Sequence, residues 1–414
     1  MRSGADRISL SFDARDPDQR AIDVAEFKGR GHPDSLADRI ADQFSRRYAR
    51  HTTSQFGVVA NHWVDKVTLV GAGATVGFGG YDIHKPVDGY LFGKVTERIG
   101  NRTLDLARIF EESCAEVFTQ CVGDPELVRY LRLHVNNTEG VGPDHSPHFY
   151  RPAGPGSVSD VHAEDRVAND TSACTGTSRL GAAGRLARAL ENRVAGYRGE
   201  LSAIGTDVKV MVVRRGDSLT ATLAVPVHPR AVRDESEYAE VIGSVRQRIL
   251  RDAGELVGAL TAEPWKLTTV KINTKDRPGR GYLAPFGTSL GKGDCGAVGR
   301  GNRYGGAIEP LAVASSEAPA GKNPLHHIGK IYTWLAHDMA RRVEAETGRY
   351  AETVVVSDNG SPLHEAAFCH VALAASRTGV SEQLVRKLWD EVLTRLPQYT
   401  AAFLAGREPG HDGS

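Results

Sequence analysis

Strands followed by a helix recur three times along the chain, over about residues 58–122, 205–258 and 266–347. The second stretch is the clearest, because apolar residues alternate along 207–227 on either side of an Arg-Gly-Asp turn, as in a β-hairpin. No repeated sequence accompanies the repeated order. The order predicts an α+β fold of three similar subdomains, each a mostly antiparallel sheet with helices on one face.

Apolar periodicity and turn residues locate the elements more closely. Residues 1–20 are expected to be a polar lead-in, and residues 406–414 a loose tail. Strands are expected over 22–27, 64–69, 267–273 and 353–357, with 74–78 as a possible partner of 64–69. Helices are expected from about Ser35 and over 103–122, 180–193, 235–253, 327–347 and 382–396.

Composition excludes several classes of function. The 414 residues include 51 basic and 51 acidic side chains, so bulk charge gives no reason to expect a nucleic-acid or membrane partner. Five cysteines without a C-x-x-C pair indicate a reducing compartment and no zinc site. A charged N-terminus and the lack of a long apolar run predict a cytoplasmic protein.

The segment from Thr288 to Lys330 is too rich in glycine to be a packed element, yet it carries many charged side chains. Glycines let the backbone approach a ligand closely. Cations and backbone N–H groups suit phosphate oxygens, and carboxylates suit Mg²⁺. The charged residues are Lys292, Asp294, Arg300, Arg303, Glu317, Lys322 and Lys330. The segment therefore predicts a site for a polyphosphate and its metal ions, with a long surface loop as the alternative.

A second basic and glycine-rich turn runs from Lys28 to Asp34 and leads into the helix expected from about Ser35. Asp34 or Ser35 is expected to cap that helix. A helix N-terminus has free N–H groups and a positive dipole, so the turn favours an anion. The alternative is that His32-Pro33-Asp34 only caps the helix.

Five motifs along the chain form a recognisable set. They are Gly31-His32-Pro33-Asp34, Ala168-Asn169-Asp170-Thr171-Ser172, Asp207-Val208-Lys209, Gly293-Asp294-Cys295-Gly296 with Gly299-Arg300-Gly301-Asn302-Arg303, and Ala320-Gly321-Lys322-Asn323-Pro324 with His327 and Lys330. Together they resemble S-adenosylmethionine synthetases, and the archaeal-type branch in particular. The resemblance covers about residues 25–374, and the GDCGxxGRGNR and GKNP blocks are its most specific parts.

The resemblance implies three interwoven α+β subdomains about a pseudo-threefold axis, over approximately 20–150, 151–260 and 261–405. It also implies a homodimer with active sites between the subunits. In the implied reaction, methionine sulfur attacks C5′ of ATP, the whole triphosphate leaves, and the bound tripolyphosphate is hydrolysed to diphosphate and phosphate. Mg²⁺ is required in this family, and K⁺ assists. Because a thioether needs no general base, alignment and charge stabilisation must supply the catalysis.

The resemblance also implies roles for individual residues. His32 would donate a hydrogen bond to the oxygen that bridges C5′ and the α-phosphate, and Asp34 would bind Mg²⁺. Lys209, Arg300 and Lys322 would hold the triphosphate, and Lys322 would also assist its hydrolysis. The remaining substrate contacts are expected from Asp170, Asp207, Asp294, Arg303, Lys330, Gly154, Gly156 and Ser157.

Two departures from the family pattern leave alternatives open. Archaeal-type relatives continue after Ser172 with an aromatic and glycine-rich run, whereas this chain reads Ala173-Cys174-Thr175-Gly176-Thr177-Ser178. Bacterial relatives have a lysine and an acid where this chain has His326 and Ile328, so metal ligands beyond Asp34 are left open. The rival hypotheses are a paralogue that adenosylates a methionine analogue or another nucleophile, and a non-catalytic nucleotide-binding protein.

Overall fold

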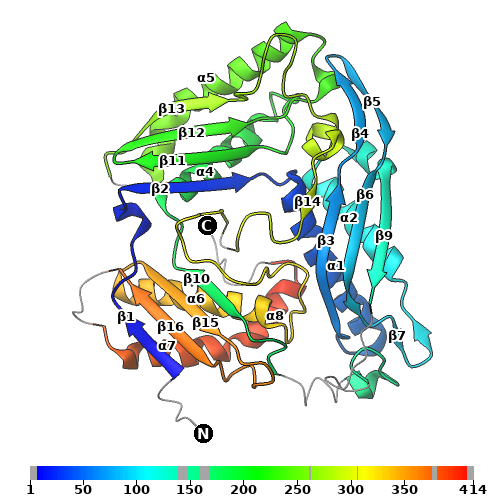
Figure 1. The fold of residues 1–414 in the computed structure, drawn as a ribbon, viewed down its shortest axis with the longest axis vertical. Helices are drawn as coiled ribbons and strands as arrows, with labels where there is room; N and C mark the ends of the chain where they lie inside the picture. Colours follow the sequence, from blue (N-terminus) through cyan, green and yellow to red (C-terminus); the bar gives the residue numbers. More distant parts are fainter. Residues whose placement is uncertain are drawn as a thin grey trace.

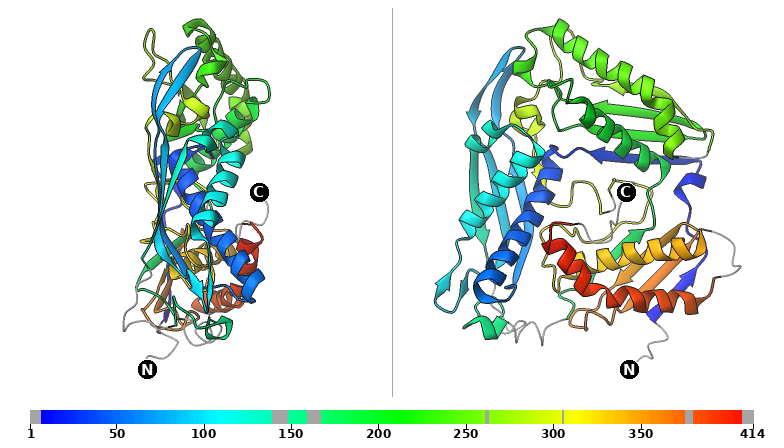
Figure 2. Two further views of the ribbon diagram at one scale, coloured as in Figure 1. Left: turned by 90° about the vertical axis from the view of Figure 1, so that its right-hand side faces the viewer. Right: turned by 180° about the vertical axis from the view of Figure 1, so that it is seen from behind.

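Three four-stranded sheets are arranged around the centre of the molecule (Figure 1). The structure is a computed structural model that describes residues 7–138, 148–158, 167–260, 263–304, 306–374 and 380–407. The helices lie mostly on one side of the sheets in the edge-on view (Figure 2). The prediction of an α+β fold is therefore confirmed. Across the described residues, every helix is too short or too polar to span a membrane.

The first sheet has the strand order β14-β3-β6-β9. Its strands and the helices packed on it are β3 (His62–Val70), β6 (Val87–Val95), β9 (Leu131–Asn137), β14 (Gly296–Ala297), α1 (Pro33–Phe56) and α2 (Leu106–Cys121). The expected pairing of 74–78 with 64–69 is wrong. Instead, β4 (Gly73–Gly77) pairs with β5 (Gly80–Lys85), because Gly79 adopts a φ of 85° and closes a tight hairpin between them.

The second sheet has the order β13-β12-β11-β2 and contains the predicted hairpin. Its elements are β2 (Ile22–Lys28), β11 (Lys209–Arg215), β12 (Ser218–Ala224), β13 (Lys266–Ile272), α4 (Ala182–Tyr197) and α5 (Glu235–Leu260). Each of these elements overlaps a predicted one. Helix α5 continues beyond its expected end at residue 253 because Leu256 and Val257 keep its apolar face buried.

The third sheet has the order β1-β16-β15-β10. Its elements are β1 (Ile8–Ser11), β10 (Ala173–Thr177), β15 (Ala351–Val356), β16 (Phe368–Leu373), α6 (Ile328–Thr347), α7 (Glu382–Thr394) and α8 (Leu396–Leu404). Two expectations are corrected here. The polar lead-in contains β1, which lies parallel to β16, and the final helix is α8, which begins at Leu396 with Pro397 in its first turn. The expected tail lies outside the described residues from 408 onward.

The three sheets share one plan. Each contains two antiparallel strand pairs and one parallel pair at an edge, which are β6–β9, β12–β13 and β16–β1. The strand at the opposite edge comes from a distant part of the chain: β14, β2 or β10. Strand β2 then leads into α1 on the first sheet, and β10 into α4 on the second. Exchanged strands therefore tie the units together, while each unit keeps its own cluster of buried apolar residues.

Short elements complete the connections between the sheets. They are η2 (Pro17–Gln19), β7 (Arg98–Ile99), β8 (Arg102–Thr103), η3 (Pro125–Tyr130), η4 (Pro229–Ala231), η5 (Pro285–Gly287) and η6 (Ser289–Lys292). Within the glycine-rich segment, only η6, β14 and the first turn of α6 form regular structure among its described residues. Its other described residues form a loop, as the glycine content predicts.

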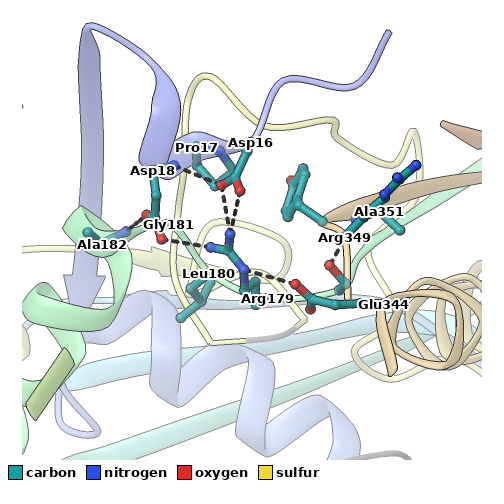
Figure 3. A network of polar contacts seen from close by, with 12 residues as sticks. Asp16, Pro17, Asp18, Arg179, Leu180, Gly181, Ala182, Glu344, Arg349 and Ala351 are labelled. Atoms are coloured by element: carbon teal, nitrogen blue, oxygen red, sulfur yellow. Dashed lines mark hydrogen bonds and ion pairs between the residues drawn. The ribbon is translucent and has the colours of Figure 1, made fainter. Parts of the chain in front are cut away.

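Arg179 joins three separate parts of the chain at one point (Figure 3). Its guanidinium group donates to both carboxylate oxygens of Asp16 at 2.7 Å, and to Asp18 at 2.8 Å. It also donates to Glu344, near the end of α6, at 3.0 Å. Asp16 and Asp18 belong to the turn at η2, and Arg179 lies just before α4. Three carboxylates thus share one cation, which screens their mutual repulsion, and Asp18 has Arg185 as a second partner at 3.0 Å.

Candidate active site

His32 caps α1 and is held in one tautomer. Its Nδ1 accepts a hydrogen bond from the backbone N–H of Asp34 at 3.2 Å, so His32 is the N-cap in place of the expected Asp34 or Ser35. Pro33 explains the difference, because proline suits the first helical position and the cap is the residue before it. An Nδ1 that accepts leaves the proton of the neutral ring on Nε2. Burial, reinforced by Lys28 and Lys209, lowers the pKa of His32 to about 4.

Four charged side chains, from β2, β11 and α1, surround His32. Lys28 and Lys209 are cross-strand neighbours in β2 and β11. Lys209 forms an ion pair with Glu26 at 3.0 Å, and Lys28 donates to Asp34 at 2.9 Å. The structure therefore brings His32, Asp34 and Lys209 together, as expected, and adds Glu26 and Lys28. These two share one face of the strand that leads into the turn, which is a pattern that the sequence already contains.

Three acids of α1 hold the glycine-rich segment against that helix. Asp34, Asp38 and Asp42 are four residues apart and therefore share one face of α1. Each accepts a hydrogen bond at 2.7–3.0 Å from a backbone N–H of the segment, those of Ala297, Gly299 and Gly321 respectively. Burial raises the pKa of Asp38 to about 7, and the neighbouring acids add to the rise.

Arg300 lies where the segment passes β2. Lys28 donates to the backbone carbonyl of Arg300, and the side-chain amide of Asn302 bonds to the N–H and the C=O of Lys28 at 2.9 and 2.8 Å. The side chain of Arg300 is exposed. The predicted phosphate ligand Arg300 is thus adjacent to the cluster around His32.

Asp207 is buried beneath the start of the segment. Its carboxylate accepts hydrogen bonds from the N–H and the hydroxyl of Ser289 at 2.8 and 2.5 Å. Burial raises the pKa of Asp207 to about 7, and Asp294 adds to the rise. Asp294 itself is exposed. The two acids are therefore neighbours, but Asp207 anchors the segment while Asp294 faces solvent.

Lys322 is buried and is held by Asp65. Its Nζ lies 3.2 Å from the backbone oxygen and 3.3 Å from the carboxylate of Asp65, and 5.6 Å from the centre of the Trp63 ring. Asp65 also pairs with Lys66, whose side chain is 52% exposed, at 2.7 Å. One carboxylate therefore holds both an exposed lysine and the buried Lys322.

His326 and His327 stand immediately before α6. His327 is its N-cap, with Nδ1 accepting from the N–H of Gly329 at 3.1 Å, and its Nε2 lies 3.2 Å from the amide of Asn169. Burial lowers the pKa of His327 well below its usual value, and Lys322 adds to the effect. The ring of His327 packs 5.0 Å from Trp63. The motif around Asp170 therefore meets the Lys322 side of the site through its neighbour Asn169.

Several predicted residues have other attachments. Asp170 is exposed, and its carboxylate accepts from the N–H of Thr171 at 2.7 Å. Arg303 donates to the carbonyl of Glu309 at 3.0 Å, and Lys330 is buried with its Nζ 2.6 Å from Asp42. The segment with Gly154, Gly156 and Ser157 follows Pro152, whose carbonyl bonds to Gly100. In the described part of the chain, no hydrogen bond joins that segment to the groups around His32 or Lys322.

The carboxylates present suit a magnesium ion that keeps other ligands. Asp34 and Glu26 both contact Lys28 beside His32. Among the residues that the structure describes, no three Asp, Glu, His or Cys side chains form a metal-binding group. Mg²⁺ is commonly held by one or two carboxylates together with phosphate oxygens and water. This donor set therefore fits Mg²⁺ that arrives with a polyphosphate.

Comparison with known proteins decides the family. A model described as S-adenosylmethionine synthetase (AdoMet synthetase) matches residues 10–407. The chain belongs to the S-adenosylmethionine synthetase family. The S-adenosylmethionine synthase of Caldivirga maquilingensis is 32% identical over 93% of this chain and 94% of its own. That of Aeropyrum pernix is 34% identical over the same shares of the two chains.

A solved structure agrees at the level of the fold. It is that of an unusual S-adenosylmethionine synthetase from Campylobacter jejuni, with a TM-score of 0.57 and 14% identity over 90% of this chain and 85% of that one. As an archaeal-type S-adenosylmethionine synthetase, the chain is a transferase. The resemblance stated from its motifs is confirmed.

In this family member, the departure after Ser172 is part of a sheet. Residues Ala173–Thr177 form β10, which pairs with β15. Gly176 approaches α6 so closely that a Cβ there would lie 2.3 Å from the backbone of Ala336. The backbone N–H of Thr175 bonds to the Ser315 hydroxyl at 2.8 Å. The unusual residues therefore form a tightly packed wall beside the glycine-rich segment.

Proposed function

We propose that this S-adenosylmethionine synthase converts ATP, L-methionine and water into S-adenosylmethionine, diphosphate and phosphate. Family membership supports the reaction. The observation that carries the site is His32, a neutral ring with its proton on Nε2, placed among Lys28, Lys209 and Asp34. These groups match a reaction that moves negative charge onto a leaving triphosphate.

The adenosyl transfer needs a hydrogen-bond donor and no base. The sulfur–C5′ bond forms while the C5′–O bond breaks, and the electron pair of the broken bond stays on the triphosphate. His32 donates its Nε2–H to the bridging oxygen as that oxygen gains charge. Methionine sulfur carries no proton, so nothing has to remove one. A ring with a pKa of about 4 remains a neutral donor at pH 7.

The cations hold the triphosphate through both steps. Lys28, Lys209, Arg300 and Lys322 supply positive charge to its oxygens. Asp34, with Glu26, would hold Mg²⁺, and a bound Mg²⁺ would neutralise part of the phosphate charge. Water then attacks a phosphorus atom of tripolyphosphate, and cleavage of one P–O–P bond yields diphosphate and phosphate. Lys322 assists that cleavage. Assistance by K⁺ stays a prediction.

Exposure separates the expected substrate ligands into two groups. Asp170 and Asp294 are exposed, which supports their direct contact with methionine and the nucleoside. Asp207 and Lys330 are buried on protein partners, so we assign them positioning roles. The contacts expected from Arg303, Gly154, Gly156 and Ser157 stay predictions.

The assembly proposed is a homodimer with active sites between the subunits. Tyr90, Phe92 and His134 stack with ring centres 6.0 and 4.5 Å apart, and Phe92 is 40% exposed. An exposed aromatic group on a sheet supports burial against a second copy. The common plan of the sheets supports a pseudo-threefold axis that relates three subdomains, with approximate bounds 20–150, 151–260 and 261–405. The cytoplasmic location also stays a prediction.

Product analysis tests the proposal. The purified chain is incubated with ATP, L-methionine, Mg²⁺ and K⁺, and the products are identified by mass spectrometry and phosphate release. We expect S-adenosylmethionine, diphosphate and phosphate in equal amounts. If no adenosylated methionine forms, the proposal fails.

The departure from the family pattern in β10 favours one alternative hypothesis, a paralogue that adenosylates a different nucleophile. The same assay with a panel of methionine analogues distinguishes the two hypotheses. A preference of at least about tenfold for an analogue over methionine, which corresponds to about 1.4 kcal/mol of transition-state binding, would favour the paralogue. Preference for methionine would exclude it.

A further inference from the structure

The turn that carries Lys322 is attached to the edge of β3. The backbone N–H of Val64 donates to the carbonyl of Gly321 at 3.2 Å. Gly321 has a φ of 79°, and a Cβ at this position would lie 2.9 Å from both the Cβ and the carbonyl oxygen of Val64. Glycine suits the position because it allows the positive φ and the close approach together. The attachment brings Lys322 to the part of β3 that contains Trp63 and Asp65.

A β-bulge at Asp65 provides polar groups for this lysine. The register between β3 and β6 shifts between Val64 and Lys66, so Asp65 is an extra residue without a cross-strand partner. Its backbone carbonyl accepts a hydrogen bond from Lys322 at 3.2 Å. Its carboxylate lies 3.3 Å from the Nζ of Lys322 but 2.7 Å from that of Lys66. Because two lysines share this carboxylate, Asp65 compensates the buried ammonium group only in part.

The indole ring of Trp63 contacts the same ammonium group. The Nζ of Lys322 lies 5.6 Å from the ring centre, within the range of a cation–π interaction. Lys322 is 2% exposed, and these interactions are strongest where the cation has lost its water. The ring of His327 packs against Trp63 at 5.0 Å and an angle of 66°, which restrains the indole from another side.

The N–H group of the same indole has no partner. Its Nε1 is buried and, in the part of the chain that the structure covers, forms no hydrogen bond. A buried indole N–H usually finds an acceptor, and leaving it unpaired costs free energy. The contribution of Trp63 therefore comes from the face and the packing of its ring, and a phenyl ring could supply much of it without the unpaired donor.

We propose that Trp63 is a positioning residue for Lys322, whose ammonium group its ring and the bulge at Asp65 hold in place to bind the triphosphate. The inference deepens the proposed function, because it rests on the role given there to Lys322. The ring supplies what the shared carboxylate of Asp65 lacks, a second stabilising contact that Lys66 does not share.

Calorimetry on the full chain tests this role. The probe is imidotriphosphate with Mg²⁺, because the bridging N–H groups of this tripolyphosphate analogue resist hydrolysis. Trp63→Leu keeps an apolar side chain and removes the ring, so affinity should fall about five- to thirtyfold, as for a cation–π contact shielded from water. Trp63→Phe keeps a ring face and should recover most of that loss, to within about threefold of the unaltered chain.

Lys94→Met is the matched control. The Nζ of Lys94, on β6, also lies 5.6 Å from the centre of the Trp63 ring, but Lys94 has no contact with Lys322 or Asp65 among the described residues. Its replacement removes a cation from the same ring and leaves Lys322 in place. Lys94→Met should therefore bind imidotriphosphate as the unaltered chain does.

A double-mutant cycle shows whether the ring acts through the lysine. Lys322→Met should weaken binding, and adding Trp63→Leu to it should have no further effect, because the ring then has no cation to hold. A general loosening of the fold would weaken binding by the same factor in both backgrounds. Thermal unfolding shows that each variant folds, and Trp63→Met replaces Trp63→Leu in the cycle if the leucine variant does not.

Four results would overturn the proposal. They are normal binding by Trp63→Leu, normal binding by Lys322→Met, an equal loss in Trp63→Phe and Trp63→Leu, and an effect of Trp63→Leu that is the same with and without Lys322. Adenosyl transfer is measured on the same preparations. A chain with the expected coupling that makes no S-adenosylmethionine supports the positioning role and refutes the proposed function. A chain that makes S-adenosylmethionine without the coupling refutes the positioning role alone.

Discussion

At the scale of single residues, the cap of α1 and the chemistry of His32 depend on the same atom. Nδ1 accepts the N–H of Asp34, and the proton therefore lies on Nε2. Protonation of the ring would place a donor where the cap needs an acceptor. The two interpretations of His32-Pro33-Asp34, helix cap and anion site, are thus compatible.

The pH dependence of turnover follows from this cap. The pKa of His32 is lowered from 6.5 to about 4, so the unfolded chain binds a proton between these values that the folded chain does not. Stability from the neutral cap is present above pH 6.5 and is lost as pH falls toward 4. We expect kcat/KM to show no ionisation of His32 near pH 6.5. A break near pH 6.5 that disappears in His32→Gln would contradict this assignment.

Asp65 offers a second test at this scale. In the described part of the chain, both hydrogen-bond partners of the Lys322 ammonium group belong to Asp65. Asp65→Ala removes the carboxylate and leaves the carbonyl, so kcat/KM for ATP should fall about tenfold, as for one lost charge-assisted hydrogen bond. Lys66→Ala is the control, because Lys66 pairs with the same acid but is 52% exposed. Equal effects of the two variants would exclude a positioning role for Asp65.

At the scale of elements, the acids of α1 act as a ladder that holds the glycine-rich segment in place. Asp34, Asp38 and Asp42 present carboxylates at intervals of four residues, and the segment supplies backbone N–H groups. Lys28 and Lys330 neutralise the two outer acids. Asp38, in the middle, carries the cost of burial beside two like charges.

A neutral replacement of Asp38 should therefore stabilise the protein at high pH. The folded-state pKa of Asp38 is raised to about 7, so the folded chain loses stability as pH rises from about 4 to about 7. Asp38→Asn keeps an acceptor for Gly299 and removes the charge. Its Tm relative to the unaltered chain should rise between pH 5 and pH 8, measured by thermal unfolding. Glu111→Gln, at an exposed site on α2, is the control. If the Tm difference between Asp38→Asn and the unaltered chain did not change with pH, the charge on Asp38 would not destabilise the fold.

How far the sequence predicts these elements depends on the range of the interactions. Helix α1 and the β11–β12 hairpin follow from local periodicity and turn residues. Strands β1 and β10 do not, because each is short and is stabilised by pairing with β16 or β15, more than 150 residues away in sequence. Helix α8 was missed because Pro397 obscured its start.

The site divides in the same way. His32, Asp34 and Lys209 stand in motifs that resemble a known family, and the structure brings them together. In the sequence, Asp65 stands beside Lys66 and has the pattern of a solvent-exposed charge pair. Its contact with Lys322 joins residues that are far apart in the chain, so the sequence alone does not reveal it.

At the scale of the whole molecule, strand exchange makes the three units depend on one another. Arg179 reinforces this dependence, because its partners lie in η2 and α6 while it precedes α4. Loss of its cation removes this partner from Asp16 and Glu344, while Asp18 keeps Arg185 at 3.0 Å. The site lies where β2 and β11 of one unit meet α1 of another, so the same exchange also positions the reacting groups.

Arg179→Ala should accordingly lower the stability of the whole chain. We expect a loss of about 2 kcal/mol, less than for a fully buried pair because the side chain is 29% exposed. Arg179→Lys should restore part of it. Arg108→Ala breaks the exposed pair with Glu112 and should cost less than about 0.5 kcal/mol. Thermal unfolding measures all three, and equal Tm values for Arg179→Ala and Arg108→Ala would contradict the bracing role.

The reaction assigned to the whole molecule depends on the hydrogen bond from His32. The rate of S-adenosylmethionine formation from ATP and L-methionine is measured for the unaltered chain and for His32→Ala, with nucleotide binding measured in parallel. Loss of one donor to a developing negative charge predicts a rate reduced by about two to four powers of ten, with ATP binding retained. Formation of S-adenosylmethionine by His32→Ala at the unaltered rate would contradict the mechanism.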